Sequence, residues 1–323
     1  MNRKPLVLAV SVALCAGCNL ALADAKVNGF ADITYMVKDS NSSESGVGGT
    51  QGKFAANAEA DFTAALGDKT SLRMDVDFGL GINGGTSASS VTGDARQGPA
   101  DSAVIEQVYF AFKPVSNITV LGGVFNNPIG WEAGDAPDMY QTSSGQIAGI
   151  FDGQTILYGN NIAGLAAAGT FGPVTITAAL LNDLAQADKK NSAALVVNAT
   201  PIKGLDVELG YVTQATSAKN VLDLNATFKT GGLTVGAEYM SADKIVDKAM
   251  GVTANYAIND TFGVTGRYDT VGYQASGAKD TTSFTLAGSV KLDKGLTAVA
   301  EFRNDDNGTK TSDLVQLEFI ATF

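Results

Sequence analysis

The chain has 323 residues, of which 45% are hydrophobic, and 33 acidic against 22 basic side chains give a formal net charge of −11. It contains no histidine, which excludes Ser-His hydrolases, histidine-ligated zinc sites and acid–base catalysis by histidine. Both cysteines lie in the first 20 residues, so the rest of the chain has no disulfide, and the acidic balance argues against a nucleic-acid partner.

Residues 1–23 have the pattern of a secretory signal peptide. Asn2-Arg3-Lys4 is followed by an uncharged stretch, and Ala21-Leu22-Ala23 forms an A-x-A cleavage site. The strongly apolar part of this stretch is too short to span a bilayer as a helix. Cleavage after Ala23 leaves residues 24–323 as a single exported domain. A lipoprotein signal, in which Cys18 is acylated, stays open as the alternative.

The first clear strands are residues 53–66 and 72–78, in which apolar and polar side chains alternate. Phe62 and Ala64, for example, alternate with Asp61 and Thr63. A period of two residues gives a strand one apolar and one polar face. The same pattern returns at residues 205–212, 222–229, 233–240, 284–292, 296–303 and 315–323.

Short turns and longer polar connections alternate along the chain. Seven short turns rich in Gly, Pro, Asn and Asp lie at 67–68, 114–117, 172–173, 201–204, 231–232, 259–260 and 293–295. Eight longer connections lie at 40–52, 84–102, 126–152, 184–190, 217–219, 243–246, 274–279 and 305–311. Together they require sixteen strands. Short turns at one end and long loops at the other are typical of outer-membrane barrels, so the predicted fold class is all-β, a transmembrane antiparallel β-barrel with short periplasmic turns and long external loops.

Aromatic side chains on the apolar faces gather at the ends of the predicted strands. Those next to short turns are Phe112, Phe171, Phe228, Tyr256 and Phe262. Those next to long loops are Phe54, Phe78, Phe125, Tyr211, Tyr239, Tyr268 and Phe302. Two such belts, one at each bilayer interface, favour a membrane barrel over a soluble β-sandwich.

The last residues, Leu317–Phe323, form an amphipathic strand that ends in phenylalanine. Here the chain resembles the outer-membrane porins of Gram-negative bacteria, whose last strand typically ends in an aromatic residue read by the barrel insertion machinery. The segment Leu121–Gly130, followed by Glu132, is similar to the strand-and-loop segment of the OmpL-like β-barrel porins. The resemblance implies an outer-membrane location, an assembly signal at Phe323, and contact with outer-membrane lipid and lipopolysaccharide. It leaves a homotrimer open, because the Pro-Glu-Phe-Gly-Gly sequence of classical trimeric porins is absent.

The longest connection, residues 126–152, is the strongest candidate for a functional loop. In sixteen-stranded porins the third external loop folds inward and narrows the channel, and the resemblance assigns that role to this loop. Its candidate constriction residues are Trp131, Glu132, Asp135, Asp138 and Tyr140. A loop that faces outward from the surface is the alternative.

The polar faces of the strands supply the predicted channel lining. The candidate lumen residues are Lys53, Glu59, Asp61, Arg73, Asp75, Asp77, Asp206, Glu208, Arg267 and Arg303. Inward acids outnumber inward bases, which predicts a weak preference for cations. We expect no cofactor, metal ion or catalytic residue. The pattern G-x-G-x-x-G at 79–84 is not followed by a helix, and residues 304–308 lack the spacing of a calcium loop.

The predicted function is therefore that of a porin through which small hydrophilic solutes and ions diffuse passively across an outer membrane. A barrel of sixteen strands is wide enough for an aqueous channel. A surface barrel with an adhesive or structural role and no open channel is the alternative, which conductance in planar bilayers distinguishes. An outer-membrane enzyme is disfavoured by the missing histidine.

Overall fold

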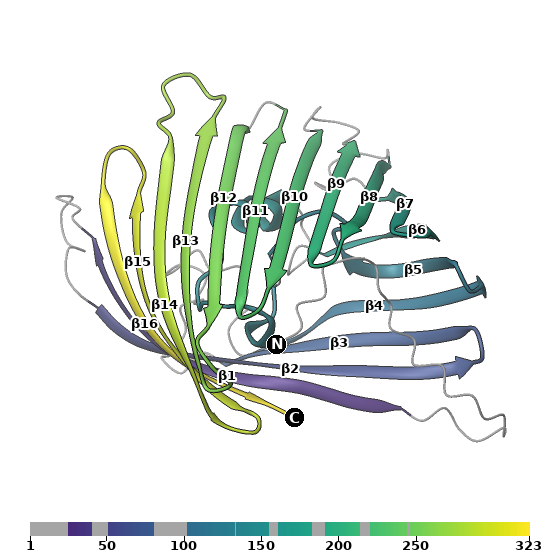
Figure 1. Ribbon diagram of the computed structural model, residues 1–323, viewed down its shortest axis with the longest axis horizontal. Helices are drawn as coiled ribbons and strands as arrows, with labels where there is room; N and C mark the ends of the chain where they lie inside the picture. Colours follow the sequence, from purple (N-terminus) through teal and green to yellow (C-terminus); the bar gives the residue numbers. More distant parts are fainter. Residues whose placement is uncertain are drawn as a thin grey trace.

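The computed structural model describes residues 25–40, 51–80, 102–132, 134–154, 161–182, 191–213, 220–243 and 246–323. Within these ranges, sixteen antiparallel strands form a closed barrel in which each strand pairs with its neighbours in sequence and β1 pairs with β16 (Figure 1). The predicted signal peptide lies outside the described residues and stays a prediction. Neither described helix has the length and apolar character needed to cross a membrane.

The predicted fold class and strand number are confirmed. The strands are β1 (Lys26–Ser40), β2 (Gln51–Gly67), β3 (Thr70–Leu80), β4 (Ser102–Val115), β5 (Ile118–Asn126), β6 (Asn161–Phe171), β7 (Val174–Leu181), β8 (Ser192–Ile202), β9 (Leu205–Thr213), β10 (Val221–Thr230), β11 (Leu233–Ala242), β12 (Val246–Ala257), β13 (Phe262–Tyr273), β14 (Thr281–Asp293), β15 (Leu296–Asp306) and β16 (Thr311–Thr322). Each of the seven predicted short turns joins two consecutive strands.

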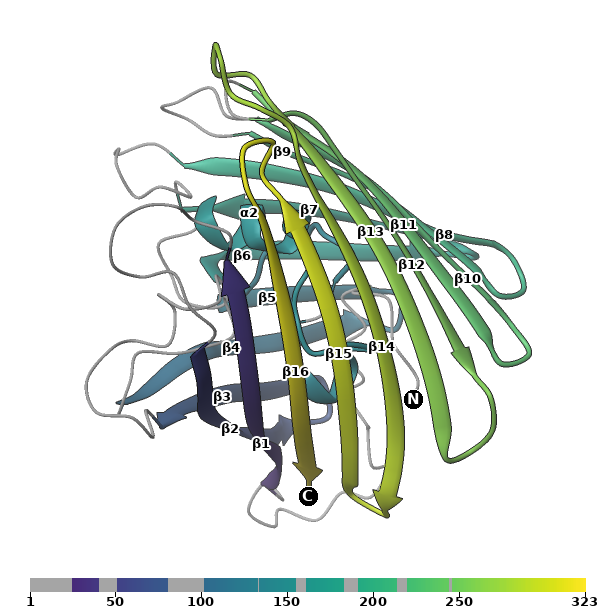
Figure 2. The same cartoon turned by 90° about the vertical axis from the view of Figure 1, so that its left-hand side faces the viewer.

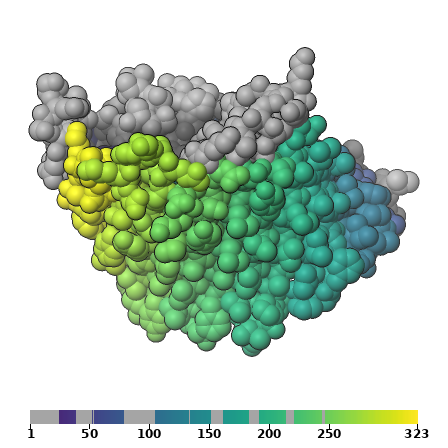
Figure 3. All heavy atoms as spheres, turned by 90° about the horizontal axis from the view of Figure 1, so that it is seen from above, coloured from purple at the N-terminus to yellow at the C-terminus, as the bar shows by residue number. Residues whose placement is uncertain are grey.

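The two faces of the strands differ as the alternation predicts. Large apolar side chains such as Leu195, Leu286 and Phe302 are exposed on the outer face. Polar and charged side chains such as Glu208 and Thr285 are buried on the inner face. Figure 3 shows the outer face as a continuous surface of neighbouring strands, from the yellow C-terminal strands to the teal strands in the middle of the chain. The outer band therefore has the apolar character that a lipid environment requires.

A charge on the outer face of β2 should destabilise the barrel far more than a charge on its inner face. Ala58 pairs with Ala31 and Phe78 on the outer face, and Asn57 pairs with Asp32 on the inner face. We expect Ala58→Arg to lower the free energy of unfolding by about 2–4 kcal/mol in lipid, because the guanidinium enters the apolar band. Asn57→Arg is the matched control, and urea unfolding in liposomes measures both. Equal losses would contradict the assignment of the two faces.

The structure corrects the predicted aromatic belt at one position, Phe125. Its side chain faces inward and is only 2% exposed, and its ring contacts Tyr109 edge-on with a centroid distance of 6.5 Å. On β5 the outward positions hold Val120, Gly122 and Val124. Because glycine and apolar residues occupy both faces of this strand, its sequence pattern does not reveal which face is inside.

The barrel closes at the seam between β1 and β16, where eleven residue pairs run from Phe30–Thr322 to Ser40–Ser312. Phe323 continues this seam, since the Gly29 amide donates to its carbonyl and its own amide donates to the Gly29 carbonyl, at 3.3 and 3.1 Å. A Cβ atom at Gly29 would lie 2.7 Å from Cζ of Phe323, so glycine makes room for the terminal ring. The assembly role of Phe323 stays a prediction.

Candidate channel lining and constriction loop

The described part of the connection between β5 and β6, residues 127–132 and 134–154, lies inside the ring of strands (Figure 2). Two short helical elements, absent from our prediction, organise it: the 3-10 turn η1 (Ala136–Asp138) and the helix α2 (Gln146–Gln154). Pro137 lies in the first turn of η1, where a fixed φ and a missing N–H are tolerated. α2 contacts β12 and β13. We call residues 126–152 the constriction loop, although its effect on the channel stays a prediction.

Trp131 attaches the first part of the constriction loop to β10 and β11. Its backbone amide donates a hydrogen bond of 2.9 Å to Oε1 of Glu238, and its indole Nε1 donates one of 2.7 Å to Oγ1 of Thr227. Both polar groups of this residue thus bind the inner wall. Because a buried indole N–H needs an acceptor, Thr227 fixes the orientation of the ring.

A buried ion pair between Glu132 and Arg267 holds the middle of the loop. Oε1 of Glu132 lies 3.1 Å from Nη1 of Arg267, and the two side chains are 5% and 2% exposed. Nε of Arg267 also lies 3.0 Å from Oδ2 of Asp269, and Nη1 donates to the Ser143 carbonyl at 2.7 Å. Glu132 in turn accepts a hydrogen bond from Nε2 of Gln141 at 2.7 Å. Glu132 therefore binds the loop to β13 and is not a free charge in the channel.

The returning part of the loop binds β13 and β15. The amides of Thr142 and Ser143 donate to Oε2 of Glu301 at 2.8 and 3.0 Å. Nη1 of Arg303 donates to the Ser144 carbonyl at 2.6 Å. The contribution of Tyr140 is its backbone carbonyl, which accepts a hydrogen bond from Oγ1 of Thr265 at 3.0 Å. The predicted lumen bases Arg267 and Arg303 thus both engage the loop.

A cluster of carboxylates covers the inner face of β2–β4, and we call it the acidic wall. Its members are Glu59, Asp61, Asp75, Asp77 and Glu106. One base from our predicted lining is among them, Arg73, whose Nη2 lies 3.2 Å from Oδ1 of Asp61 and whose Nε lies 2.7 Å from Oδ2 of Asp75. Carboxylate oxygens of Glu59, Asp77 and Glu106 all lie within 4.8 Å of one another, a spacing at which a cation could bridge them. Carboxyl groups are therefore concentrated on this side of the barrel.

Sequence reasoning missed Glu106, and a β-bulge explains why. On β4, Gln107 lies opposite Asp75 and Ile105 lies opposite Val76, which leaves Glu106 without a partner position. The extra residue turns two consecutive side chains, Glu106 and Gln107, into the interior, where both are 8% exposed. A strict alternation of faces cannot assign such a position.

The tip of the loop packs against β14–β16. Ala136 packs in a buried cluster with Ala287, Val299 and Ile320. Beside it, Asp135 lies close enough to Glu59 for a side-chain hydrogen bond. Burial raises the pKa of Asp135 to about 6, and repulsion from Asp138 and Asp61 adds to the shift. Asp138 is exposed.

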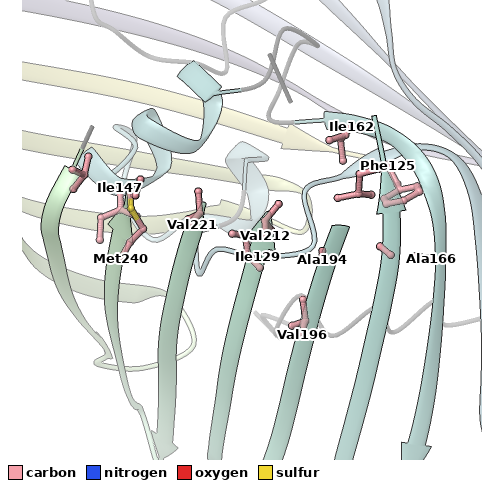
Figure 4. Packing of buried hydrophobic residues seen from close by; sticks show 14 of the residues in the cluster. Phe125, Ile129, Ile147, Ile162, Ala166, Ala194, Val196, Val212, Val221 and Met240 are labelled. Atoms are coloured by element: carbon pink, nitrogen blue, oxygen red, sulfur yellow. The ribbon is translucent and has the colours of Figure 1, made fainter. Parts of the chain in front are cut away.

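The inner face of β5–β13 carries an apolar cluster beneath the loop beside its polar residues, which corrects our expectation that inward positions are charged and polar throughout. Ile129 and Ile147 of the loop belong to one buried cluster with strand residues such as Val212 and Met240 (Figure 4). The strand members come from all nine of these strands and from β4, and Val212, Val221 and Met240 are fully buried. Burial of this apolar surface stabilises the loop against the wall at about 25 cal/mol for each Å² removed from water.

Comparison with known proteins now identifies the chain. The sequence profile of the family described as Gram-negative porin matches residues 9–310. The chain belongs to this family. No curated relative matches the sequence.

Solved structures of outer-membrane proteins share the fold of this porin. Pseudomonas putida OprB has a TM-score of 0.68 at 11% identity, over 93% of this chain and 94% of that chain. Salmonella typhi OmpF, in complex with daunomycin, has a TM-score of 0.66 at 10% identity, over 92% and 97%. A loop L8 deletion mutant of OmpT, an outer membrane protein of Vibrio cholerae, has a TM-score of 0.60 at 14% identity, over 93% and 99%. Family and fold place the porin in the outer membrane and point to a channel.

Asp206 and Glu208, which also belong to the predicted lining of the porin, lie apart from the acidic wall. Glu208 on β9 is buried and accepts hydrogen bonds from Asn198 at 2.6 Å and from Asn225 at 3.1 Å. Asp206, next to the short turn, is half-buried. Lys53 lies on β2, but its side chain is outside the described residues. The structure thus divides the predicted lining into an acidic wall on β2–β4 and a loop-binding wall on β9–β15.

Proposed function

We propose that this porin allows small hydrophilic solutes and ions to diffuse passively across the outer membrane, with a preference for cations. The observation that carries the proposal is the acidic wall, which faces Asp135 at the tip of the constriction loop. A sixteen-stranded barrel is wide enough for an aqueous channel, and charged side chains around its narrow part bias which ions enter.

The pairing of the basic residues strengthens the proposed preference. Arg267 is 2% exposed and Arg303 is 14% exposed, and both donate hydrogen bonds to carbonyl groups of the loop. Arg73 is paired with Asp61 and Asp75. Each of these ion pairs takes acids and bases out of the ion path together, and the acidic wall still holds five carboxyl groups against one base, Arg73.

Planar-bilayer recordings test the proposal directly. Purified, refolded protein should give discrete conductance steps, and reversal potentials in a KCl gradient should have the sign of potassium preference. Liposome swelling over a size series of neutral sugars should show uptake of the small sugars and exclusion of the large ones. Absence of steps would instead support a surface barrel without an open channel.

Cation preference should fall between pH 7 and pH 5. With a pKa of about 6, Asp135 is about nine-tenths ionised at pH 7 and about one-tenth ionised at pH 5, whereas a carboxyl group with an ordinary pKa stays charged. The charged and titratable groups that face it are Asp138 on the loop, Glu59 and Asp61 on β2, Arg73 on β3 and Glu106 on β4. Reversal potentials at both pH values measure the effect. The pH step should shrink in Asp135→Asn, and an equal step in both proteins would contradict the assignment.

We also propose the partners that follow from the family. The exposed apolar band contacts outer-membrane lipid, and acidic residues in the external loops bind lipopolysaccharide through bridging divalent ions. The barrel insertion machinery recognises the C-terminal strand that ends in Phe323. Detergent-solubilised protein analysed by light scattering distinguishes a homotrimer from a monomer.

A further inference from the structure

Two inward-facing glycines lie where the constriction loop meets the wall. Gly210 is the sixth residue of β9, and Gly236 is the fourth residue of β11. A Cβ atom at Gly210 would lie less than 3.0 Å from Cγ2 of Ile129, and one at Gly236 would lie less than 3.0 Å from Cζ2 and Cε2 of Trp131. Glycine inside a strand weakens it, and often marks the close approach of another part of the structure. Here the approaching groups are two side chains of the loop.

The two loop residues occupy these positions tightly. Ile129 is 2% exposed and lies in the buried cluster with Val196 and Val212, which flank Gly210 on the inner wall. Trp131 lies over Gly236 and is held by its hydrogen bonds to Thr227 and Glu238 on either side of that glycine. Any other residue at either strand position would therefore need the side chain of Ile129 or Trp131 to shift, and their close packing against the wall leaves a movement of the loop as the way to make room.

The wall holds the indole ring of Trp131 in two ways. Its face lies over Gly236, and its N–H group forms a hydrogen bond. The indole donates to Thr227 on β10, and Thr227 lies directly opposite Gly236 in the register of β10 and β11. A methyl group at residue 236 would push the ring off the wall and break this hydrogen bond. The tip of the loop, with Asp135, follows four residues later.

We propose that Gly210 and Gly236 are positioning residues that set the distance of the constriction loop from the wall and thereby the solute size limit of the channel. This inference rests on the proposed porin function. The missing side chains form two sockets, one for Ile129 and one for Trp131, so the loop lies close against β9–β11. A Cβ atom in either socket moves the part of the loop around Ile129 and Trp131 away from β9–β11 and into the channel, which narrows the path that solutes take.

Trp131 is the one tryptophan of the chain, so its fluorescence reports the occupancy of the socket without any transport measurement. Gly236→Ala should shift the emission of Trp131 to longer wavelength, because the ring moves from the wall into water. The same variant should show a lower single-channel conductance and exclude sugars that the natural protein admits. Gly210→Ala should lower the conductance in the same direction.

A second substitution at Ile129 should compensate for the added methyl group of Gly210→Ala. Ile129→Ala removes the methyl group that an added Cβ atom at Gly210 would meet, and leaves Cβ of residue 129 at 3.1 Å, a distance that a small shift relieves. Gly210→Ala/Ile129→Ala should therefore regain the conductance that Gly210→Ala loses. Gly266→Ala on β13 is the control, since nothing lies within 4 Å of its added Cβ atom. It should leave emission and conductance unchanged.

The two readouts distinguish failure of this inference from failure of the proposed function. Circular dichroism verifies the β-structure of each variant first, and the Gly210 pair provides the test if Gly236→Ala does not fold. Unchanged emission and conductance in folded Gly236→Ala and Gly210→Ala would overturn the inference, as would an emission shift with an unchanged size limit in a conducting protein. A natural protein without conductance, but with the emission shift in Gly236→Ala, would support the sockets and contradict the proposed function.

Discussion

Arg267→Met should lower the free energy of unfolding by about 3–5 kcal/mol, the cost of leaving buried carboxylates without their partner. The guanidinium is 2% exposed and pairs with both Glu132 and Asp269. It also donates hydrogen bonds to the carbonyls of Ser143 and Ser144 and to Oγ1 of Thr285. Its removal therefore leaves two buried acids without their basic partner and takes one donor from each of three acceptors, and the constriction loop should detach from β13. Urea unfolding in liposomes measures the loss, and the emission of Trp131 reports the detachment.

Variants around Arg267 separate the contribution of charge from that of shape. Arg267→Lys should recover only part of the stability, because one ammonium group cannot reach acceptors that a planar guanidinium spans. The double variant Arg267→Met/Glu132→Gln should lose less than the sum of the single losses, since it leaves one uncompensated charge fewer. Lys291→Met is the control at an exposed base and should stay within about 0.5 kcal/mol of the natural protein. A loss of stability at Arg267 no larger than that at Lys291 would contradict the role of Arg267 in holding the constriction loop on β13.

The barrel itself could be predicted from the sequence because its determinants are local. Alternation of side chains fixes the face of each residue in a strand, and a pair such as Leu286 and Thr285 shows opposite exposure, as expected. Short turns fix which strands pair, since an antiparallel hairpin needs only a few residues between its strands. Both rules depend only on residues that are close together in the chain. The pattern of a single sequence is therefore enough to apply them.

The rules failed where the pattern was ambiguous or interrupted. Phe125 follows a strand segment that is apolar or glycine on both faces, so its direction depends on packing against Tyr109 and not on its neighbours in sequence. Glu106 lies at a bulge, where one extra residue shifts the alternation. The sequence pattern shows neither where a bulge lies nor, when both faces of a strand are apolar, which face points into the barrel.

The roles within the site depend on contacts between distant residues, and these were outside the reach of the sequence. The sequence places Glu132 among the acids of the loop that were expected to line the pore. Its partner Arg267 lies 135 residues later in the chain, so the sequence does not reveal the ion pair. The pair removes one acid and one base from the predicted channel lining together. Gly210 and Gly236 are plain interruptions of a strand in the sequence, and only the approach of Ile129 and Trp131 gives them a function.

Neutralising Asp135 and Asp138 together should remove most of the loop's contribution to cation preference. A purely potassium-selective pore gives about 59 mV for a tenfold KCl gradient. We expect the reversal potential of the natural protein to have the sign of potassium preference and to stay below this limit. The reversal potential of Asp135→Asn/Asp138→Asn should be clearly closer to zero. Glu132→Gln is not equivalent, because Glu132 is buried against Arg267. Asp206→Asn, at a half-buried acid beside a short turn, is the matched control and should change the reversal potential less.

The salt dependence of the same measurement tests whether the charges act at the ion path. The Debye length is about 10 Å at 0.1 M salt and about 3 Å at 1 M, so acids on the loop and the acidic wall influence passing ions strongly only at low salt. The potassium preference should therefore decline as the mean KCl concentration rises, and the difference between the natural protein and Asp135→Asn/Asp138→Asn should decline with it. Anion preference in the natural protein would contradict the charge distribution argued here. A reversal potential that the double variant leaves unchanged at low salt would place the loop acids away from the path that ions take.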